Sequence, residues 1–349
     1  MRIGIDARAL TQHPTSGVAM FTREIIDALR CVSDDELILF TKTDIARPFR
    51  RLPIIGNHFA FARAVDKAKV DVFFSPTGLL PLGLKTPSVA FVHDLIILKH
   101  PEWFPDSIWQ RFFTLRFTMP STIRRARRVL VPSMIVRDDL VQFFPEAGDK
   151  VEVVPEGVRR PEVIQPLSDE QRQCWGVVGQ YLLSVGTLEP RKNHEAACFT
   201  LETIVVMMKL DVQLLLIGSR GWGAGAILQK IDEVNRRLGR QAVCYLGAVS
   251  EEEKWTLYQN AEMLLAVSRD EGFYLPPFEA LAVGTPVIAT AVGAVPDLLT
   301  DAVTIVQPND VEGIVQAVES VLRQKPEVTA SQLTWEQAAR RILDVFSRF

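Results

Sequence analysis

Two series of short apolar runs, separated by helix-length stretches, are the feature that most constrains the fold of this chain. The runs are continuously apolar rather than alternating, which is typical of parallel strands buried on both faces. The first series lies at residues 2–6, 36–40, 71–74, 88–92, 129–131 and 151–154, and the second at residues 181–186, 212–218, 242–247, 262–267, 286–290 and 304–307. This β–α–β rhythm predicts an α/β protein with two doubly wound parallel sheets.

The boundary between two domains is predicted within residues 157–180, which are rich in proline and polar residues. We expect an N-terminal domain over residues 1–165 and a C-terminal domain over residues 166–333. Residues 334–349 predict a further helix, because their apolar side chains recur at helical spacing. Two placements are open for that helix: the edge of a helical layer, or a return to the first domain. Two such domains make a cleft between them, with ligands at the carboxyl ends of the strands.

The composition is that of a folded, soluble protein. Of the 349 residues, 48% are apolar and 23% are charged, which excludes disordered, collagen-like and coiled-coil chains. No apolar run approaches the roughly 18 residues of a membrane-spanning helix, and Asp6 and Arg8 interrupt the stretch that a signal peptide would need. The four cysteines are widely spaced and form no C-x-x-C pair, so we expect plain thiols and no structural zinc. The expected location is the cytoplasm.

The charge is divided unevenly along the chain. Residues 1–165 carry 23 Lys and Arg against 19 Asp and Glu, whereas residues 166–349 carry 16 against 23, so the halves have net charges of +4 and −7. This division indicates that the N-terminal half faces an anionic group, such as a phosphorylated ligand or a lipid surface. Nucleic acid is a poor partner, because the pI is about 6.0 and no recognition motif is present.

The stretch DEGFYLPPFEALAVGTPVIAT, residues 270–290, is the strongest motif of the chain. Glu271 and Glu279 are eight residues apart, and the two prolines between them are predicted to open a helix. The free N–H groups at such a helix start can bind an anion, and carboxylates suit sugar hydroxyls. We expect Glu279 in the first helical turn, where a helix-capping carboxylate is the alternative interpretation.

A second motif, SVGTLEPRKNHEA, covers residues 184–196 and directly follows the first predicted strand of the second series. Arg191 and Lys192 lie in the loop after that strand, and Asn193 is the predicted N-cap of the next helix. Two fixed cations in a strand–helix loop suit a diphosphate, although a solvated basic pair in a turn is the alternative.

Taken together, these motifs resemble the retaining glycosyltransferases of family four, which have the GT-B fold of two Rossmann-like domains. The resemblance covers nearly the whole chain. Its specific parts are SVGTLEPRKN, YLGAVSEEEKWTLYQNA at residues 245–261, and EGFYLPPFEALAVGTPVIAT with the family's Glu-x7-Glu motif. In the first domain, TSGVAMFTREIIDAL at residues 15–29 and FVHDL at residues 91–95 look like the family's glycine-bearing and histidine-bearing loops.

The resemblance implies a role for each matching residue. Arg191 and Lys192 would neutralise the diphosphate of a nucleotide-sugar donor, and Glu279 would hold the ribose hydroxyls. Glu271 would bind a hydroxyl of the transferred sugar, and His93 would lie near the reacting carbon. The predicted catalytic residues are thus His93, Glu271, Arg191 and Lys192; the donor-binding positions also include Gly17, Gly186, Val249, Gly272, Phe273, Leu275 and Glu279.

Some of these assignments have alternatives. A lone histidine after a strand is often structural, and Asp94 could either orient the His93 ring or bind sugar. Gly17 would let its loop approach a ligand closely, because a Cβ there would obstruct passage. Glu156 stands where the family often has asparagine.

The family retains the anomeric configuration of the donor, and the departing phosphate oxygen is thought to deprotonate the acceptor hydroxyl. The chain has no D-x-D triplet to hold a metal on the diphosphate, so neither a metal nor a cofactor is expected. The developing negative charge would be stabilised by the two cations and by helix N–H groups.

An arginine-rich stretch spans residues 111–137, with seven arginines and no acidic residue. Trp109, Phe112, Phe113 and Phe117 recur at helical spacing near its start. Two interpretations compete: a core helix whose arginines are solvated, or a surface for anionic lipid. The second suits an enzyme whose acceptor is a lipid-linked oligosaccharide.

The sequence therefore predicts a metal-independent glycosyltransferase, peripheral on the inner face of the cell membrane. We expect it to move mannose from GDP-mannose onto a polyprenyl-diphosphate-linked saccharide in bacterial surface-polysaccharide synthesis. A UDP- or dTDP-sugar donor remains open, and so does a non-catalytic module that binds a nucleotide sugar. A GT-B phosphorylase would need a pyridoxal-phosphate lysine context, which we do not find.

Overall fold

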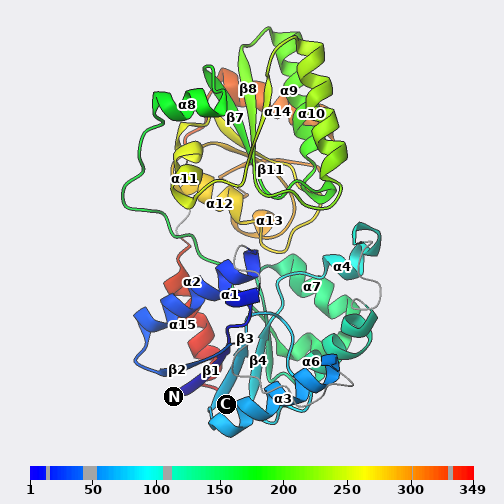
Figure 1. Ribbon diagram of the computed structural model, residues 1–349, viewed down its shortest axis with the longest axis vertical. Helices are drawn as coiled ribbons and strands as arrows, with labels where there is room; N and C mark the ends of the chain where they lie inside the picture. Colours follow the sequence, from blue (N-terminus) through cyan, green and yellow to red (C-terminus); the bar gives the residue numbers. More distant parts are fainter. Residues whose placement is uncertain (13–15, 42–52, 105–111, 301, 329–332) are drawn as a thin grey trace. The chain divides into compact units, whose positions relative to one another are not determined.

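The computed structural model describes residues 1–12, 16–41, 53–104, 112–300, 302–328 and 333–349 (Figure 1). The chain divides into two compact units. Unit 1 comprises Met1–Gly157 and Leu333–Phe349, and unit 2 comprises Val158–Gln332. Within the described residues, no helix is long and apolar enough to cross a membrane.

Unit 1 is built on a six-stranded parallel sheet in the order β2-β1-β3-β4-β5-β6. The strands are β1 (Arg2–Asp6), β2 (Glu36–Phe40), β3 (Val72–Ser75), β4 (Ser88–Phe91), β5 (Arg128–Val131) and β6 (Val151–Val153). The helical segments are α1 (Ala9–Gln12), α2 (Gly17–Val32), α3 (Pro53–Ala68), α4 (Ile96–Lys99), η2 (Pro101–Trp103), the π-helical η3 (Thr114–Thr118), α6 (Met119–Arg125), α7 (Met134–Phe143), η4 (Pro145–Lys150) and α15 (Trp335–Phe346).

Unit 2 repeats this plan with a six-stranded parallel sheet in the order β12-β11-β10-β7-β8-β9. The strands are β7 (Gln180–Val185), β8 (Val212–Ile217), β9 (Val243–Gly247), β10 (Met263–Ala266), β11 (Val287–Thr290) and β12 (Thr304–Val306). The helical segments are α8 (Asp169–Trp175), η5 (Pro190–Lys192), α9 (His194–Met208), α10 (Ala224–Leu238), α11 (Glu251–Asn260), α12 (Leu275–Ala282), α13 (Val295–Leu298) and α14 (Val311–Arg323).

Each predicted apolar run corresponds to one strand, so the expected fold class is confirmed. The reason is burial on both faces of the sheet: β3, β4, β8, β10 and β11 are buried along their whole length. In unit 1, one apolar core joins the sheet to α2 and α15, and another joins it to α3, α6 and α7. This two-sided cover is the arrangement of a doubly wound sheet.

The C-terminal helix α15 returns to unit 1, which is one of the two placements that the sequence left open. Its N-terminus is held by a capping box in which Thr334 and Gln337 each bond the other's backbone N–H. The buried stripe packs against α2 and β3, with ring centroids of Phe21 and Trp335 5.6 Å apart and those of Phe74 and Phe346 5.7 Å apart. The helix α15 therefore completes the core of unit 1. The sequence alone did not show that unit 1 includes the C-terminal residues.

The predicted domain boundary after residue 165 lies too far along the chain. The first pass of the chain through unit 1 ends at Gly157. The residues that follow pack on unit 2, where the carbonyl of Gln165 accepts a bond from Thr256 Oγ1 at 3.2 Å and Leu167 is buried. The predicted linker also contains the helix α8, which begins with a capping box of Ser168 and Gln171.

Gly157 marks a close approach of two distant segments within unit 1, which gives a test of this packing. A Cβ on Gly157 would lie 2.2 Å from the backbone nitrogen of Trp335. We expect Gly157→Ala to lower the free energy of unfolding by about 1–3 kcal/mol, because backbone cannot move aside as a side chain can. Gly148→Ala is the matched control, since a Cβ there meets nothing within 4 Å. Urea denaturation followed by circular dichroism measures both, and equal midpoints would contradict the packing.

Candidate active site

Two loops of unit 2 bring most of the predicted site residues together. β7 and β10 are neighbours in the parallel sheet, so their carboxyl ends lie side by side. The loop after β7 leads into η5 with Arg191 and Lys192, and the loop after β10 carries Glu271 before α12 begins at Leu275. The backbone N–H of Arg269 donates to the carbonyl of Arg191 at 2.8 Å, which ties the two loops directly.

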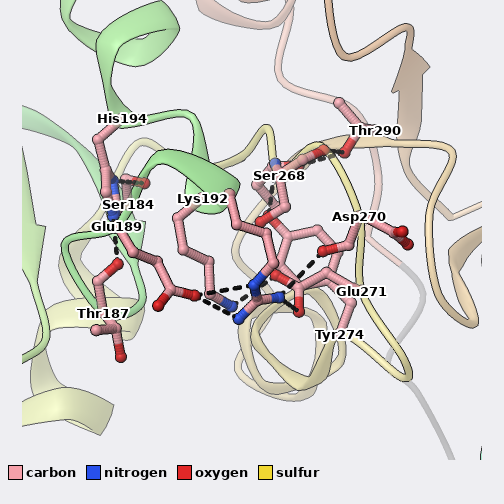
Figure 2. Close-up of polar contacts among 12 residues, drawn as sticks. Ser184, Thr187, Glu189, Lys192, His194, Ser268, Asp270, Glu271, Tyr274 and Thr290 are labelled. Atoms are coloured by element: carbon pink, nitrogen blue, oxygen red, sulfur yellow. Dashed lines mark hydrogen bonds and ion pairs between the residues drawn. The ribbon is translucent and has the colours of Figure 1, made fainter. Parts of the chain in front are cut away.

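Four charged side chains from these loops form the cluster that we call the Glu271 cluster: Glu189, Arg191, Lys192 and Glu271. Figure 2 shows the side chains of Lys192 and Glu271 pointing toward one another. Lys192 Nζ lies 2.6 Å from Glu271 Oε1, and the Arg191 guanidinium contacts Glu271 Oε2 and lies 2.7 Å from Glu189 Oε1. The Glu271 side chain is only 8% exposed. The predicted basic pair is therefore neither solvated nor isolated, but matched by two carboxylates.

The charges of the Glu271 cluster hold each other in the ionised state. Burial alone would raise the pKa of Glu271, but the charges of Lys192 and Arg191 outweigh it and lower the pKa to about 2. Burial lowers the pKa of Lys192, and the charge of Glu271 offsets part of that effect. The half-buried cations thus depend on the carboxylate of Glu271.

Backbone geometry around Gly186 positions the lysine. Gly186 has φ 152°, and a Cβ on it would lie 3.0 Å from Lys192 Cδ and Cε. A Cβ on Gly218, at the end of β8, would lie 2.1 Å from the carbonyl oxygen of Gly186. These two glycines allow the β7 and β8 loops to pass close together, so that the stem of Lys192 lies over Gly186.

Asn193 occupies the predicted N-cap position of α9, but its side chain does not cap the helix. Its backbone is left-handed, with φ 57°, and its Nδ2 donates to the carbonyls of Val267 at 3.1 Å and Pro308 at 2.9 Å. Asn193 therefore fixes the Arg191–Lys192 loop to the loops after β10 and β12. His194, the next residue, is buried, and burial lowers its pKa to about 4.

Glu279 does not lie in the first turn of α12, as the sequence predicted, because the helix begins at Leu275 and Glu279 is its fifth residue. The alternative role of a capping carboxylate is therefore wrong as well. Its carboxylate instead accepts from Lys254 Nζ at 2.8 Å and from Tyr258 Oη at 2.8 Å, both on α11. Sequence reasoning missed Lys254 and Tyr258. Their spacing of four residues places them on one face of a helix, but it does not show that this face meets Glu279.

The other predicted positions of unit 2 lie at the N-terminal ends of α12 and α11. Gly272 and Phe273 precede Tyr274, the N-cap of α12, which has φ 78°. The Phe273 ring stacks on Phe278 with centroids 4.7 Å apart. The carbonyl of Phe273 accepts from the N–H of Ala294 at 2.9 Å. Val249 is half-buried and lies directly before Ser250, the N-cap of α11.

The predicted histidine belongs to unit 1, in the loop after β4. Its Nε2 lies 2.8 Å from the carbonyl oxygen of Pro76, and its Nδ1 lies 3.5 Å from Glu156 Oε1. The rings of Phe21 and Phe91 lie against His93, at centroid distances of 4.8 Å and 4.9 Å. Glu156 is thus the carboxylate beside the ring, whereas Asp94 accepts a bond from the backbone N–H of Ile96 at 3.1 Å.

Gly17 was predicted in a loop, but it is the first residue of α2, where Ser16 caps the helix by accepting from the N–H of Ala19. A Cβ on Gly17 would meet no atom within 4 Å. No neighbour within the described part of the protein therefore requires glycine here.

The arginine-rich stretch is only partly described, since Trp109 and Arg111 lie outside the described residues. Phe112 is 54% exposed and Phe117 is 51% exposed, with ring centroids 6.2 Å apart. The interpretation in which these two aromatic side chains pack in the core is therefore wrong for both of them. Four arginines of the stretch are exposed: Arg116, Arg124, Arg127 and Arg137.

The dependence of the cations on Glu271 can be tested by the pH dependence of stability. Because the native pKa of Glu271 is about 2, below its ordinary 4.5, its ionised form stabilises the fold above that ordinary value, and this contribution is lost as pH falls toward 2. We expect Glu271→Gln to lower the free energy of unfolding by about 3–5 kcal/mol at neutral pH, and by less in acid.

Urea denaturation at neutral pH and again below the ordinary pKa of Glu271 measures the effect. Glu233→Gln is the control, because its pair with Arg237 is about half exposed and is worth at most about 1 kcal/mol. A loss of stability in Glu271→Gln that does not change with pH would contradict the role of the charge.

Two protein-family models match this chain. The family model "Glycosyl transferases group 1" matches residues 171–341, and "Glycosyltransferase Family 4" matches residues 17–160. The two matched segments together span most of both units.

Individual relatives and structures agree with these matches. The chain is 25% identical over 381 residues to O-antigen chain mannosyltransferase B of Escherichia coli, covering 96% of this chain and 97% of that protein. It is 27% identical over 233 residues to the O-antigen chain mannosyltransferase RfbU of Salmonella typhimurium, covering 66% of this chain and 59% of that protein. The crystal structure of HepE from Anabaena, in complex with UDP and glucose, is similar in fold over all of both chains, with a TM-score of 0.76 and 16% identity.

The Glu-x7-Glu motif, the basic loop after β7 and the two parallel sheets thus occur in a chain that both family models match. The chain belongs to the family-four glycosyltransferases, and it is a glycosyltransferase with the GT-B fold.

Proposed function

We propose that this enzyme transfers mannose from GDP-mannose, with retention, onto a polyprenyl-diphosphate-linked saccharide in bacterial surface-polysaccharide synthesis. The observation that carries the donor part is the Glu271 cluster, in which two cations and a carboxylate lie together at the carboxyl ends of β7 and β10. The choice of mannose and of a polysaccharide acceptor rests on the relatives, which are named as O-antigen mannosyltransferases. A UDP- or dTDP-sugar is the alternative donor.

In the proposed reaction, the diphosphate of the donor meets Arg191 and Lys192. The bond between the anomeric carbon and the diphosphate oxygen breaks, and a bond to the acceptor oxygen forms on the same face of the sugar. The released phosphate oxygen takes the proton of the acceptor hydroxyl, so no side-chain base is needed. Negative charge therefore grows on the diphosphate, where two prepositioned cations stabilise it most.

The carboxylate of Glu271 has a second task in this proposal. It matches the charge of Arg191 and Lys192 while keeping acceptor positions for a hydroxyl of the transferred sugar. The diphosphate and the sugar then lie on either side of the same ionic cluster. Arg191 and Lys192 take the part that a metal ion plays in other sugar transferases, so we propose neither a metal nor a cofactor.

We also propose that unit 1 contacts an anionic membrane surface through residues 112–137. The support is the exposure of Phe112 and Phe117 together with the exposed arginines of that stretch. Aromatic rings enter the lipid interface, and each nearby arginine adds about 1 kcal/mol of attraction to anionic lipid. A surface of this kind would hold the enzyme beside a lipid-linked acceptor on the inner face of the cell membrane.

Donor binding is tested by the thermal midpoint of unfolding in the presence of GDP, UDP, dTDP or ADP. We expect GDP alone to raise the midpoint, because a ligand of the folded state stabilises it by mass action. Lys192→Ala should abolish that rise and lower turnover by about 100- to 1,000-fold. Lys230→Ala is the control, since Lys230 pairs with Glu233 at 3.8 Å on α10. If no nucleotide raises the midpoint at millimolar concentration, the proposed donor site is wrong.

Membrane contact is tested by sedimentation with vesicles of phosphatidylglycerol. The double variant Phe112→Ser and Phe117→Ser should bind at least about tenfold more weakly, because burying one Phe is worth about 1.5–3 kcal/mol. Phe199→Ser is the matched control, since Phe199 is 48% exposed and lies on α9 of unit 2. Equal binding of the double variant and the wild-type enzyme would remove this part of the proposal.

A further inference from the structure

Tyr274 lies next to the Glu271 cluster, but the proposed reaction gives it no task. It is the N-cap of α12, is 5% exposed, and has φ 78° and ψ 65°. This left-handed region suits glycine, whereas a bulky residue adopts it only at a cost in free energy. The contacts of the Tyr274 side chain must therefore offset that cost.

Left-handed backbone occurs on both loops that supply the Glu271 cluster. Within the described part of the chain, the residues other than glycine with positive φ are Lys69, Asn193, Lys209 and Tyr274. Asn193 directly follows Lys192 after β7, and Tyr274 follows Glu271 after β10. Residues of this kind gather at functional sites, where the surroundings enforce a conformation that the residue alone disfavours.

The Tyr274 side chain is fixed at both of its ends. Its Oη accepts from the backbone N–H of Ser268 at 3.3 Å (Figure 2). At the other end, the loop after β11 approaches closely, since a Cβ on Gly293 would lie 3.3 Å from Tyr274 Cβ. Burial, and then the charge of Glu271, raise the pKa of the Tyr274 phenol, so the ring stays neutral at physiological pH.

The face of this ring meets a cation of the Glu271 cluster. Lys192 Nζ lies over the Tyr274 ring, 5.5 Å from its centroid, and 2.6 Å from Glu271 Oε1. The Lys192 side chain is 12% exposed. The negative face of an aromatic ring attracts an ammonium, and the attraction is stronger where water is excluded. Lys192 thus has two neighbours of different kinds, a carboxylate and a neutral ring.

These two neighbours act differently on the charge of Lys192. Glu271 neutralises the ammonium, and alone it would draw the lysine into a closed ion pair. The ring has no net charge and accepts no ordinary hydrogen bond, so it fixes the direction of Nζ without competing with an anion for it. An ammonium has three N–H groups, and among the described residues Glu271 is the one acceptor that they reach. Lys192 therefore keeps N–H groups for an incoming diphosphate.

We propose that Tyr274 is a positioning residue of the donor site, whose ring face holds the Lys192 ammonium in place for the terminal phosphate of a nucleoside diphosphate. The inference rests on the proposed donor site and adds the residue that orients one of its two cations. It also gives the left-handed backbone of Tyr274 a function, because this backbone carries the ring to Lys192.

The competing explanation is that the Tyr274 ring only fills space before α12. Loss of the ring would then lower stability, and it would weaken nucleotides with one phosphate and with two phosphates alike. A positioning role instead changes the ratio of the two affinities, because the second phosphate is the group that Lys192 is held for. The ratio of diphosphate to monophosphate affinity therefore separates the two explanations.

The test is calorimetric titration of GDP, GMP, UDP and UMP into the full chain. We expect the wild-type enzyme to bind the diphosphate of the preferred base about 10- to 100-fold more tightly than the monophosphate. Tyr274→Leu and Tyr274→Gly should each reduce that ratio by at least about threefold. Glycine adopts positive φ without strain, so Tyr274→Gly keeps the backbone conformation even if leucine disturbs it.

Two further variants separate the ring face from other effects. Tyr274→Phe retains the ring and loses only the hydroxyl, so it should keep the ratio within about twofold of the wild-type value. Tyr181→Leu is the matched control for the loss of a buried tyrosine, because Tyr181 lies near the start of β7, whereas the Glu271 cluster follows the end of that strand. The hydroxyl of Tyr181 donates to the carbonyl of Leu257 at 2.8 Å. This control should keep the wild-type ratio even if the variant is less stable.

Three results would overturn the inference in different ways. An unchanged ratio in Tyr274→Leu and Tyr274→Gly, with GDP binding still lost in Lys192→Ala, would keep the donor site and remove the role of Tyr274. An equal fall of the ratio in Tyr274→Phe would assign the effect to the bond with Ser268 rather than to the ring face. Absence of binding by all four nucleotides would overturn the proposed donor site, and the inference with it.

Discussion

The pairing of a buried carboxylate with two half-buried cations is the constraint on which the candidate site of unit 2 depends. Removing a charge from water is costly unless an opposite charge and good hydrogen bonds replace the solvent. Glu271 supplies the opposite charge for both Lys192 and Arg191, and Glu189 forms a second ion pair with Arg191. Such a cluster is possible only where two loops are fixed relative to each other. The parallel pairing of β7 with β10 and the bonds from Asn193 to the loops after β10 and β12 provide this fixation.

Most of the fold could be predicted from the sequence, because parallel strands buried on both faces leave continuous apolar runs. The position of α15 could not be predicted in this way. The periodic spacing of Trp335, Ala338 and Ile342 shows that one face of the helix is buried, but not which surface buries it. Helix α8 was missed although its capping box stands in the sequence, because proline and polar residues around it outweighed a helix of seven residues. The extent of each unit is set by long-range packing, such as Gly157 on Trp335, which has no local signal.

For the site, the sequence named the charged residues but not their partners. Glu271 lies about eighty residues after Arg191 and Lys192 in sequence, and only the pairing of β7 with β10 brings them into contact. Asn193 is the N-cap residue of α9 as predicted, but its side chain does not cap the helix, because the amide donates to two other loops. Lys254 and Tyr258 were not singled out, since a lysine and a tyrosine four residues apart on a helix are ordinary surface or core residues until a buried carboxylate is seen opposite them. A sequence motif thus identifies which functional groups are present, whereas tertiary contacts determine which other groups each of them can bind.

The two glutamates of the Glu-x7-Glu motif show how tertiary contacts give residues of the same type different surroundings. Glu271 precedes α12 and turns toward the cations after β7, whereas Glu279 lies within α12 and turns toward α11. The partners of Glu271 are cations on a strand–helix loop, where an incoming anion can share them. The partners of Glu279 are one cation already shared with Glu251 and one neutral phenol, so little charge is left there for an anion. Under the proposed function, Glu271 therefore lies beside cations that a diphosphate can share, whereas the donors around Glu279 leave no such cation. Residues of the same type, eight positions apart, acquire different binding properties because different donors surround them.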